Sequence, residues 1–341
     1  MRNKLAPNVR AAAIGVAAFV ATAGLIHALL PPMVPKGVAA KLKFYSEHKD
    51  EFDTVIVGTS QLYYAASPEI FDTVTRENGL PTRTFNFGID GMHPPENFYV
   101  LDLILKTRPK NLKWVLLELG DVQARWEKIL GTQRAVYWHD WPRTKLTLQK
   151  AWNPRGTVRG PIQLSRLWVA RRDLASNLTL FGKQFANVGR AADFLPAAKR
   201  ERFADSAVEL GPKKDGYRFA GDAMAPEQAE GFQKRLAHEI AVAGEKRSSP
   251  ATERGYRYAA VRIRAAGAKP IFVLPPTIFQ SAPRFKRSTG AVPVIAFNDA
   301  QKFPEFYDPK ARVDDSHLTR EAAESFTRLL AREFIRHAAE P

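Results

Sequence analysis

The hydrophobic pattern begins with an apolar run from Ala11 to Leu30, interrupted by the polar His27 near its end, and two prolines then end it. About 20 residues in a helix span roughly 30 Å, the thickness of the hydrocarbon core of a bilayer. The pattern therefore predicts a transmembrane signal-anchor at residues 11–32, with residues 1–10 in the cytoplasm. The alternatives are a buried helix of a soluble domain, which would show a polar face, and a cleaved signal peptide, whose apolar core has roughly 7–15 residues.

After this run, short apolar stretches alternate with amphipathic patterns. The apolar stretches are residues 53–58, 83–87, 113–119 and 269–274. The amphipathic stretches are residues 67–77, 94–106, 254–266 and 317–336. Strands that are apolar at every position are typical of parallel sheets buried on both faces. The alternation predicts an α/β fold for residues 33–341, with a mainly parallel sheet between two helical layers in a three-layer α/β/α arrangement.

The stretch from about residue 135 to residue 249 interrupts this alternation and holds much of the positive charge. The chain has a formal net charge of +16, and residues 141–220 contain 16 Lys or Arg against 6 Asp or Glu. We interpret residues 135–249 as a basic, mostly helical insertion that caps the sheet. Its aromatic segment 137–141 favours either sugar stacking or a small core of its own. The charge predicts an anionic glycan or lipid surface as partner.

The composition also excludes several classes of protein. The chain has no cysteine, which rules out disulfides, thiolate catalysis and Cys-ligated zinc. The sequence has neither a glycine-rich phosphate loop nor a dinucleotide fingerprint, so we expect no cofactor and no metal. It has no zinc-finger spacing, aromatic RNA-binding motif or helix-turn-helix, so we expect no nucleic-acid partner.

The first chemical motif is Gly58-Thr59-Ser60, at the end of the first predicted strand. Crevices in open α/β sheets form at the carboxyl ends of the strands, where a serine hydroxyl can act as a nucleophile. We expect Gly58 to permit the sharp turn that presents Ser60. An ordinary turn serine would have the same local pattern.

The second motif is Asp314-Asp315-Ser316-His317, directly before the last predicted helix. A carboxylate three residues before a histidine can turn back and orient the imidazole, which then accepts a serine proton. Helix capping would explain an aspartate or serine at this position. It gives no reason for His317. Together with Ser60, the pattern predicts a Ser60-His317-Asp314 triad.

The third motif is a glycine loop at the end of the second predicted strand, residues 85–93, with the sequence Phe-Asn-Phe-Gly-Ile-Asp-Gly-Met-His. The backbone N–H of a glycine in such a loop can point into the cleft and bind a developing oxyanion. We expect Gly91 to take this role, although glycine is also frequent in plain turns.

The order of the three motifs resembles that of the SGNH/GDSL hydrolase superfamily. That family has Gly-x-Ser after its first strand, a glycine loop after its second and Asp-x-x-His before its final helix. The resemblance implies a flavodoxin-like sheet, Ser60 as nucleophile, His317 as general base and Asp314 as its orienting residue. It also implies that the N–H groups of Ser60 and Gly91 form part of an oxyanion hole.

Two positions depart from the family pattern. Thr59 stands where the family commonly has aspartate, and no asparagine follows the third strand, where Asp121 cannot donate as a carboxylate. Losing one oxyanion donor typically costs about 2.7–4 kcal/mol in the barrier. The auxiliary candidates for this donor are Gln61, Asn86 and His93.

An N-terminal anchor before such a motif resembles the branch of the superfamily that assists O-acylation of cell-envelope polymers. The resemblance implies a serine esterase or O-acyltransferase that acts on a cell-envelope or exopolysaccharide glycan, with a membrane O-acyltransferase as a partner. It implies a single-pass protein of the inner membrane with its catalytic domain in the periplasm. The alternative is a weakly active or inactive glycan-binding scaffold of a polysaccharide biosynthesis complex.

Overall fold

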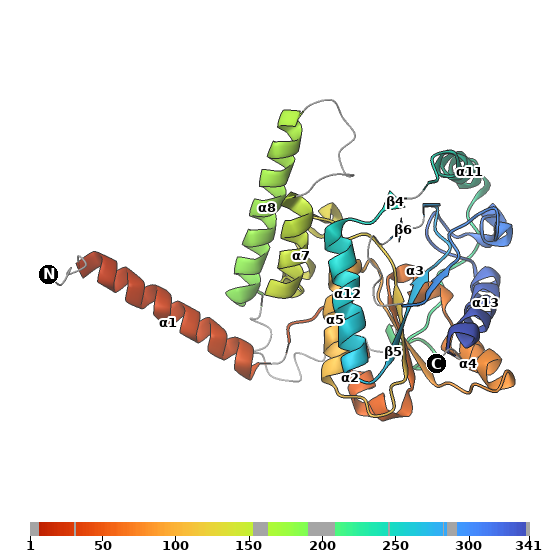
Figure 1. The fold of residues 1–341 in the computed structure, drawn as a ribbon, viewed down its shortest axis with the longest axis horizontal. Coiled ribbons are helices and arrows are strands. Elements are labelled where there is room, and N and C mark those ends of the chain that lie inside the picture. The colour runs from red at the N-terminus through yellow and green to blue at the C-terminus, as the bar shows by residue number, and fades with distance from the viewer. Residues whose placement is uncertain are drawn as a thin grey trace.

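The computed structural model describes residues 7–30, 32–152, 163–189, 209–244, 246–281, 283–284 and 292–338. At its centre lies a five-stranded sheet with the order β2-β1-β3-β5-β7, in which every pairing is parallel (Figure 1). Its strands are β1 (Thr54–Gly58), β2 (Thr84–Gly88), β3 (Trp114–Glu118), β5 (Lys269–Leu274) and β7 (Val294–Ala296). Two short strands, β4 (Lys246–Arg247) and β6 (Pro283–Arg284), pair separately.

The side chains of the central strands alternate between two hydrophobic cores. Val55 and Val57 point into one core, with α2 (Lys36–His48), α5 (Pro94–Lys106) and α12 (Pro250–Ala265). Ile56 points into the other core, with α4 (Pro68–Glu77) and α13 (Arg320–Ala338). Burial on both faces explains why these strands are apolar at successive positions. The predicted α/β fold with a mainly parallel sheet is confirmed.

The predicted elements agree with the observed ones except near the chemical motifs. The four predicted strands are present within a residue or two of their expected ends, while β7, α2 and the short α3 (Ser60–Ala65) were not predicted. The last helix was expected from His317, but α13 begins at Arg320. The Thr319 carbonyl accepts the Ala323 N–H at 2.8 Å at its start. His317 therefore lies in the preceding loop, where its ring is not constrained by helical backbone.

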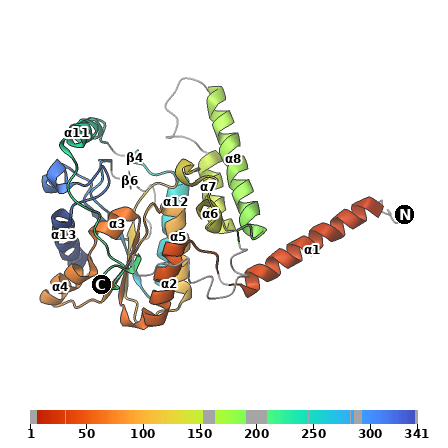
Figure 2. The same cartoon turned by 180° about the vertical axis from the view of Figure 1, so that it is seen from behind.

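The N-terminal helix α1 (Pro7–Leu29) extends away from the sheet and its helices (Figure 1). Figure 2 shows the same projection from behind. Only 6% of the most apolar stretch of α1 is buried inside the structure. The helix is long and apolar enough to cross a membrane, and it does not form the interior of the domain.

The described parts of residues 135–249 spread around the sheet. Helix α7 (Trp141–Trp152) packs against α5 and α12, and α6 (Gln133–Tyr137) and α7 pack against α8 (Gln163–Phe185) (Figure 1). Farther along, Asp215 lies along the outer edge of β2, where its carbonyl accepts the Asn86 N–H at 2.8 Å. Helix α11 (Pro226–Ala241) contacts the turn at residues 309–311. Of segment 137–141, the residues Tyr137, Trp138 and His139 are buried.

Candidate active site

Ser60 lies at the carboxyl end of β1 as the first residue of α3, so its N–H has no partner within that helix. Gly58 does not adopt the left-handed backbone that would require glycine for a turn. Its missing side chain serves another purpose, because a Cβ there would lie 2.5 Å from Glu118 Oε2. The expected reason for Gly58 is therefore corrected from a sharp turn to the close approach of Glu118.

Thr59 is held by the buried carboxylate of Glu118 at the end of β3. The Thr59 N–H donates to Glu118 Oε2 at 2.7 Å, and the Thr59 hydroxyl donates to Oε1 at 2.8 Å. The same hydroxyl accepts the Gln61 N–H at 3.1 Å and caps α3. Burial raises the pKa of Glu118 to about 7, against the hydrogen bonds from Thr59 that lower it. A second carboxylate at residue 59 would face Glu118, so threonine suits this position.

Asp314 shapes the loop before α13 through local hydrogen bonds. Its Oδ1 accepts the N–H groups of Ser316 at 2.7 Å and His317 at 2.9 Å. The loop closes where the Val313 N–H donates to the His317 carbonyl at 3.0 Å. One carboxylate oxygen thus fixes the backbone, and the other remains directed at the His317 ring.

The side chains of Ser60, His317 and Asp314 form a continuous hydrogen-bonded relay. His317 Nε2 lies 2.8 Å from Ser60 Oγ, and His317 Nδ1 lies 2.8 Å from Asp314 Oδ2. The relay joins residues that are 257 positions apart in the sequence. These distances fit the geometry of a nucleophile, its base and the carboxylate that orients the base.

The relay is open to solvent at its carboxylate end. The side chain of Asp314 is 52% exposed and that of His317 is 18% exposed. Partial burial raises the pKa of Asp314, but hydrogen bonds from the His317 ring and the Ser316 N–H outweigh it and leave the pKa below its ordinary value. Because its pKa is lowered, Asp314 is ionised at neutral pH, as an orienting carboxylate must be. On the other side, the Tyr64 ring meets the imidazole edge-on, with centroids 5.3 Å apart.

Gly91 lies in the loop after β2 with a φ of 61°, a backbone conformation that favours glycine. Arg134 of α6 approaches it, with Nη1 3.5 Å from the place of a Cβ on Gly91. Glu96 holds the other two guanidinium nitrogens of Arg134, at 3.0 Å (Nε) and 3.2 Å (Nη2). Tyr137 donates its hydroxyl to the same carboxylate. The third guanidinium nitrogen is left on the Gly91 side.

The three auxiliary candidates occupy different positions. Asn86 is fully buried, and its amide group donates to two carbonyls of the α3 turn, at 2.9 Å and 2.7 Å, so it has no donor left for a ligand. Gln61 is partly exposed next to Ser60. His93 is 3% exposed and stacks on Trp126 with centroids 5.0 Å apart.

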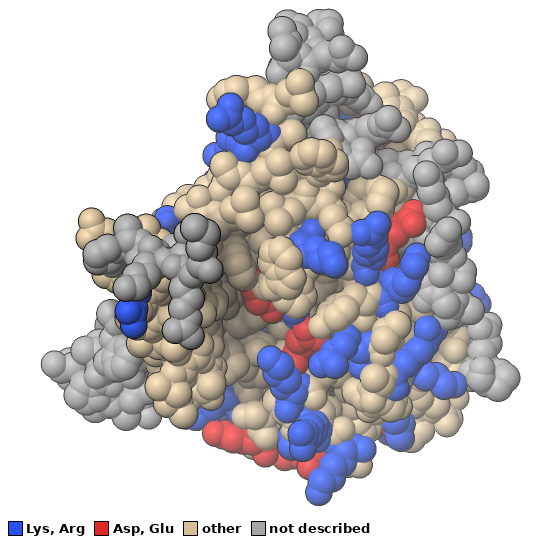
Figure 3. Space-filling view, turned by 60° about the vertical axis from the view of Figure 1, so that its left-hand side comes forward, with Lys and Arg blue, Asp and Glu red and all other residues tan. Residues whose placement is uncertain are grey.

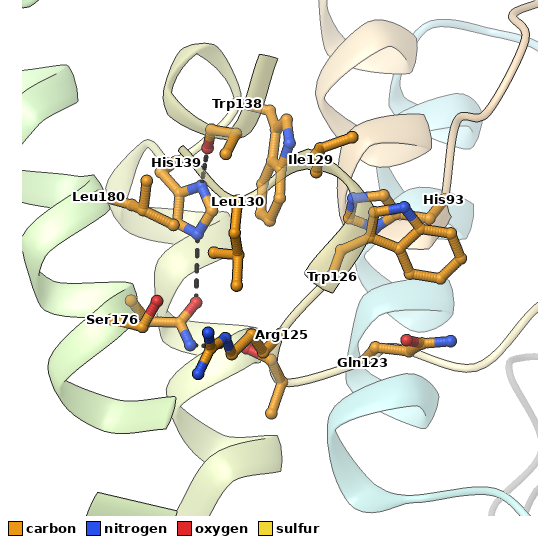
Figure 4. Close-up of a pocket in the computed structure, with 13 residues that line it drawn as sticks. His93, Gln123, Arg125, Trp126, Ile129, Leu130, Trp138, His139, Ser176 and Leu180 are labelled. Carbon is orange, nitrogen blue, oxygen red and sulfur yellow. Dashed lines mark hydrogen bonds between the residues drawn. The ribbon is translucent and has the colours of Figure 1, made fainter. Parts of the chain in front are cut away.

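His93 lines a small cavity between the loop after β3 and helices α6 and α8. Trp138 and His139 line it directly after the end of α6 (Figure 4). Asn177 lines it from α8. His139 Nε2 lies 3.1 Å from Asn177 Oδ1 and its Nδ1 faces the Ala135 carbonyl, and the neutral ring donates its one N–H to one of these two acceptors. Neither ring nitrogen of His93 nor Trp138 Nε1 has a hydrogen-bond partner among the described residues. Burial lowers the pKa of His93 to about 3 and that of His139 to about 4, so both rings are neutral.

The fully buried Lys41 binds backbone carbonyls at the start of the glycine loop. Lys41 Nζ donates to the carbonyls of Gly88 and Gly216, both at 2.6 Å, and of Asn86 at 3.1 Å. It also lies 3.8 Å from the centroid of the Tyr63 ring. Burial lowers the pKa of Lys41 well below its usual range. Through this residue, helix α2 holds the end of β2 in place.

Sequence reasoning identified the relay but missed Glu118, Arg134 and Lys41. Glu118 left a signal, because it is an acidic residue inside an otherwise apolar strand. Arg134 and Lys41 left no signal in the sequence, since each resembles the other basic residues around it.

No protein-family model matches the chain, and no curated protein matches it either.

Proposed function

We propose that this protein is a serine esterase or O-acyltransferase in which Ser60, His317 and Asp314 act as one catalytic unit. The observation that carries this proposal is the relay of two 2.8 Å hydrogen bonds from Ser60 Oγ through His317 to Asp314. At a partly exposed site, where water competes, a hydrogen bond between a serine and a histidine that are distant in the sequence contributes little to the stability of the fold. Proton transfer from the hydroxyl gives the arrangement a purpose.

The proposed reaction has two acyl-transfer steps. Ser60 Oγ attacks the carbonyl carbon of an acyl ester while His317 Nε2 accepts the hydroxyl proton. The bond from that carbon to the leaving alcohol breaks, and the imidazolium returns the proton to the alcohol. Water or a sugar hydroxyl then attacks the acyl-serine, His317 takes its proton, and the proton passes back to Ser60 Oγ. Asp314 stabilises the imidazolium in each step.

In this proposal, the N–H groups of Ser60 and Gly91 bind the oxyanion that forms in both steps. Arg134 adds a cationic donor beside Gly91. The fork to buried Glu96 supports this role, because it fixes the guanidinium plane before any ligand arrives. A preorganised cation stabilises developing negative charge more than a mobile one does.

We propose a cell-envelope or exopolysaccharide glycan as the substrate and an inner membrane as the location. The support is the resemblance of the three motifs to the SGNH/GDSL superfamily, with its three-layer fold, and the presence of α1. The open relay suits a polymer, since half of the Asp314 side chain is exposed. The short basic N-terminus would remain in the cytoplasm, and the domain would face the periplasm, near a membrane O-acyltransferase as acyl donor.

A fluorophosphonate probe tests the proposal because it bonds only to an activated serine. The full chain should become labelled, whereas Ser60→Ala and His317→Ala should not. The matched control is Ser316→Ala, which lies in the same loop and leaves the relay complete. If the wild-type protein never labels, the protein is not a serine hydrolase, and the glycan-binding scaffold becomes the better explanation. If Ser60→Ala labels normally, the nucleophile is another residue.

A further inference from the structure

One face of helix α8 is exposed from Leu167 to Lys183 and combines large apolar with basic side chains. Its residues follow a spacing of three and four, which places them on one side of a helix. We name it the α8 outer face and define it as Leu167, Trp168, Arg171, Ala175, Leu178, Thr179, Gly182 and Lys183. Leu167, Trp168 and Leu178 are 71%, 64% and 52% exposed. The opposite side of α8 carries buried Asp173, Asn177 and Leu180.

The charge on this face has one sign. Its ionisable residues are Arg171 and Lys183, and the acidic Asp173 is turned inward. Figure 3 brings forward the side of the molecule that carries α1 and α8, and blue basic side chains greatly outnumber red acidic ones on that view. Trp, Leu and basic residues on one helical face are typical of helices that lie in the interface of an anionic bilayer.

The α8 outer face is continuous with the helix that is able to cross a membrane. The ring of Phe185, at the end of α8, lies 6.4 Å from the Phe19 ring and 6.2 Å from the His27 ring of α1. Asn187 also donates to the Ala23 carbonyl of α1 at 3.4 Å. The aromatic contacts continue through Phe181 to Trp141 of α7, which is 54% exposed.

This contact fixes where α8 lies relative to a bilayer. Helix α1 and α8 are on the same side of the molecule, far from α11 and α13 (Figure 1). If α1 crosses the bilayer, Phe185 at the end of α8 meets it between Phe19, in the middle of the helix, and His27, near its C-terminal end. A helix joined there lies at the boundary between the headgroups and the acyl chains, where Trp side chains are favourable.

We propose that the α8 outer face rests on the anionic surface of the bilayer that α1 crosses. The inference depends on the proposed membrane anchoring and not on the proposed chemistry. Apolar side chains enter the headgroup boundary, and Arg171 and Lys183 bind anionic headgroups. The domain then has two attachments to the membrane, which restricts its rotation about α1.

The absence of cysteine makes a site-specific test direct. Nitroxide labels are attached to Trp168→Cys and Leu178→Cys in the full chain, reconstituted in vesicles of phosphatidylcholine with or without phosphatidylglycerol. Accessibility to oxygen, which partitions into lipid, is compared with accessibility to a water-soluble nickel complex. The lipid reference is Val16→Cys in α1, and the water reference is exposed Gln228→Cys in α11.

We expect labels at 168 and 178 to lose nickel accessibility and gain oxygen accessibility relative to position 228, most strongly with phosphatidylglycerol. Arg171→Glu combined with Lys183→Glu should reverse this gain in anionic vesicles, and high salt should weaken it. Labels at 168 and 178 that behave like the label at 228 in both lipids, while the label at 16 is in lipid, would overturn the proposal. A water-exposed label at 16 would overturn it through the anchoring, with the relay unaffected.

Discussion

Two regions of the molecule differ in whether their polar atoms have hydrogen-bond partners. One is the loop that carries Asp314 and His317, and the other is the cavity wall around His93. In the exposed loop, both carboxylate oxygens of Asp314 and both ring nitrogens of His317 have hydrogen-bond partners. In the buried wall, both ring nitrogens of His93 and Trp138 Nε1 have none among the described residues. The more exposed group is thus the better ordered by polar contacts.

This difference separates the proposed catalytic site from a region held by packing. A buried polar atom without a partner costs free energy, so the His93 wall is kept by aromatic stacking despite its polar atoms. Full pairing in the loop contributes little stability where water competes. Its effect is to hold the imidazole in one orientation and one tautomer.

The largest expected effect comes from replacing Asp314 with Asn. The amide oxygen can still accept the N–H groups of Ser316 and His317, so the loop keeps its shape. The amide nitrogen then faces His317 Nδ1 and favours the wrong tautomer, and the probe-labelling rate should fall by about 10⁴-fold, as in other triads.

Asp315→Ala is the matched control for that change. Its carboxylate pairs with Arg235 on the protein surface at 2.7 Å and does not contact the imidazole. Labelling should therefore persist. Loss of labelling in Asp315→Ala together with full labelling in Asp314→Asn would show that the orienting carboxylate is misassigned.

Arg134 lies next to Gly91 and close enough to His93 to contribute to the lowered pKa of that ring. Arg134→Gln should lower the labelling rate by about 10²–10³-fold if the guanidinium binds the oxyanion. Tyr137→Phe removes a neighbouring hydrogen bond to Glu96 but keeps the Arg134 fork, so it should label nearly normally. An equal loss of labelling in both variants would mean that Arg134, Glu96 and Tyr137 affect the site only by stabilising the fold.

Glu118 gives a pH-dependent effect of intermediate size. Its pKa of about 7 lies above that of a glutamate in the unfolded chain, so the folded protein binds this proton more tightly than the unfolded chain does. The resulting contribution to the free energy of unfolding is fully present below about pH 4.3 and is lost as the pH rises through 7. Glu118→Gln cannot ionise, so its free energy of unfolding should fall by up to about 3 kcal/mol less than that of the wild type between pH 5 and pH 8. The comparison is the change with pH, because the amide nitrogen would face one of the two donors of Thr59 at either pH. Urea unfolding at both pH values measures this, and an equal pH dependence of the variant and the wild type would refute the raised pKa.

The smallest effect is expected for His93→Phe. Because the folded-state pKa of His93 is lowered to about 3, the neutral ring stabilises the fold above about pH 6.5, and this contribution is lost as the pH falls through 3. The phenyl ring should change the free energy of unfolding at pH 7 by no more than about 1 kcal/mol and reduce acid sensitivity. His139→Phe, which removes the hydrogen bond that the neutral ring donates to Asn177 or to the Ala135 carbonyl, should destabilise at pH 7. Equal effects of both changes would contradict the contrast.

Much of the fold was predictable because burial on both faces leaves an unambiguous pattern. The strands that contain Val55, Leu116 and Phe272 are apolar at nearly every position and were found in the sequence. Helix α2 was missed because Lys41 reads as a surface residue, although three backbone carbonyls bind it in the interior. Strand β7 has only three residues, with Val294 and Ala296 exposed, so it offers no apolar run.

The relay was predictable for a different reason, since its Asp314–His317 half is local. Three residues of separation suffice for the loop to bring the two side chains together. The contacts that support Ser60 and Gly91 are long-range: Glu118 lies 59 positions from Thr59, and Arg134 lies 38 positions from Glu96. Such pairs depend on how strands and helices are placed, which periodicity does not determine.

The wide separation of Ser60 and His317 also has a consequence for synthesis. The ribosome makes the serine early and the histidine 257 residues later. In the proposed mechanism, a nascent or prematurely terminated chain that lacks the loop before α13 carries the hydroxyl without its base. Such incomplete molecules could not attack esters around them, because His317 is added only after all five strands of the central sheet have been translated.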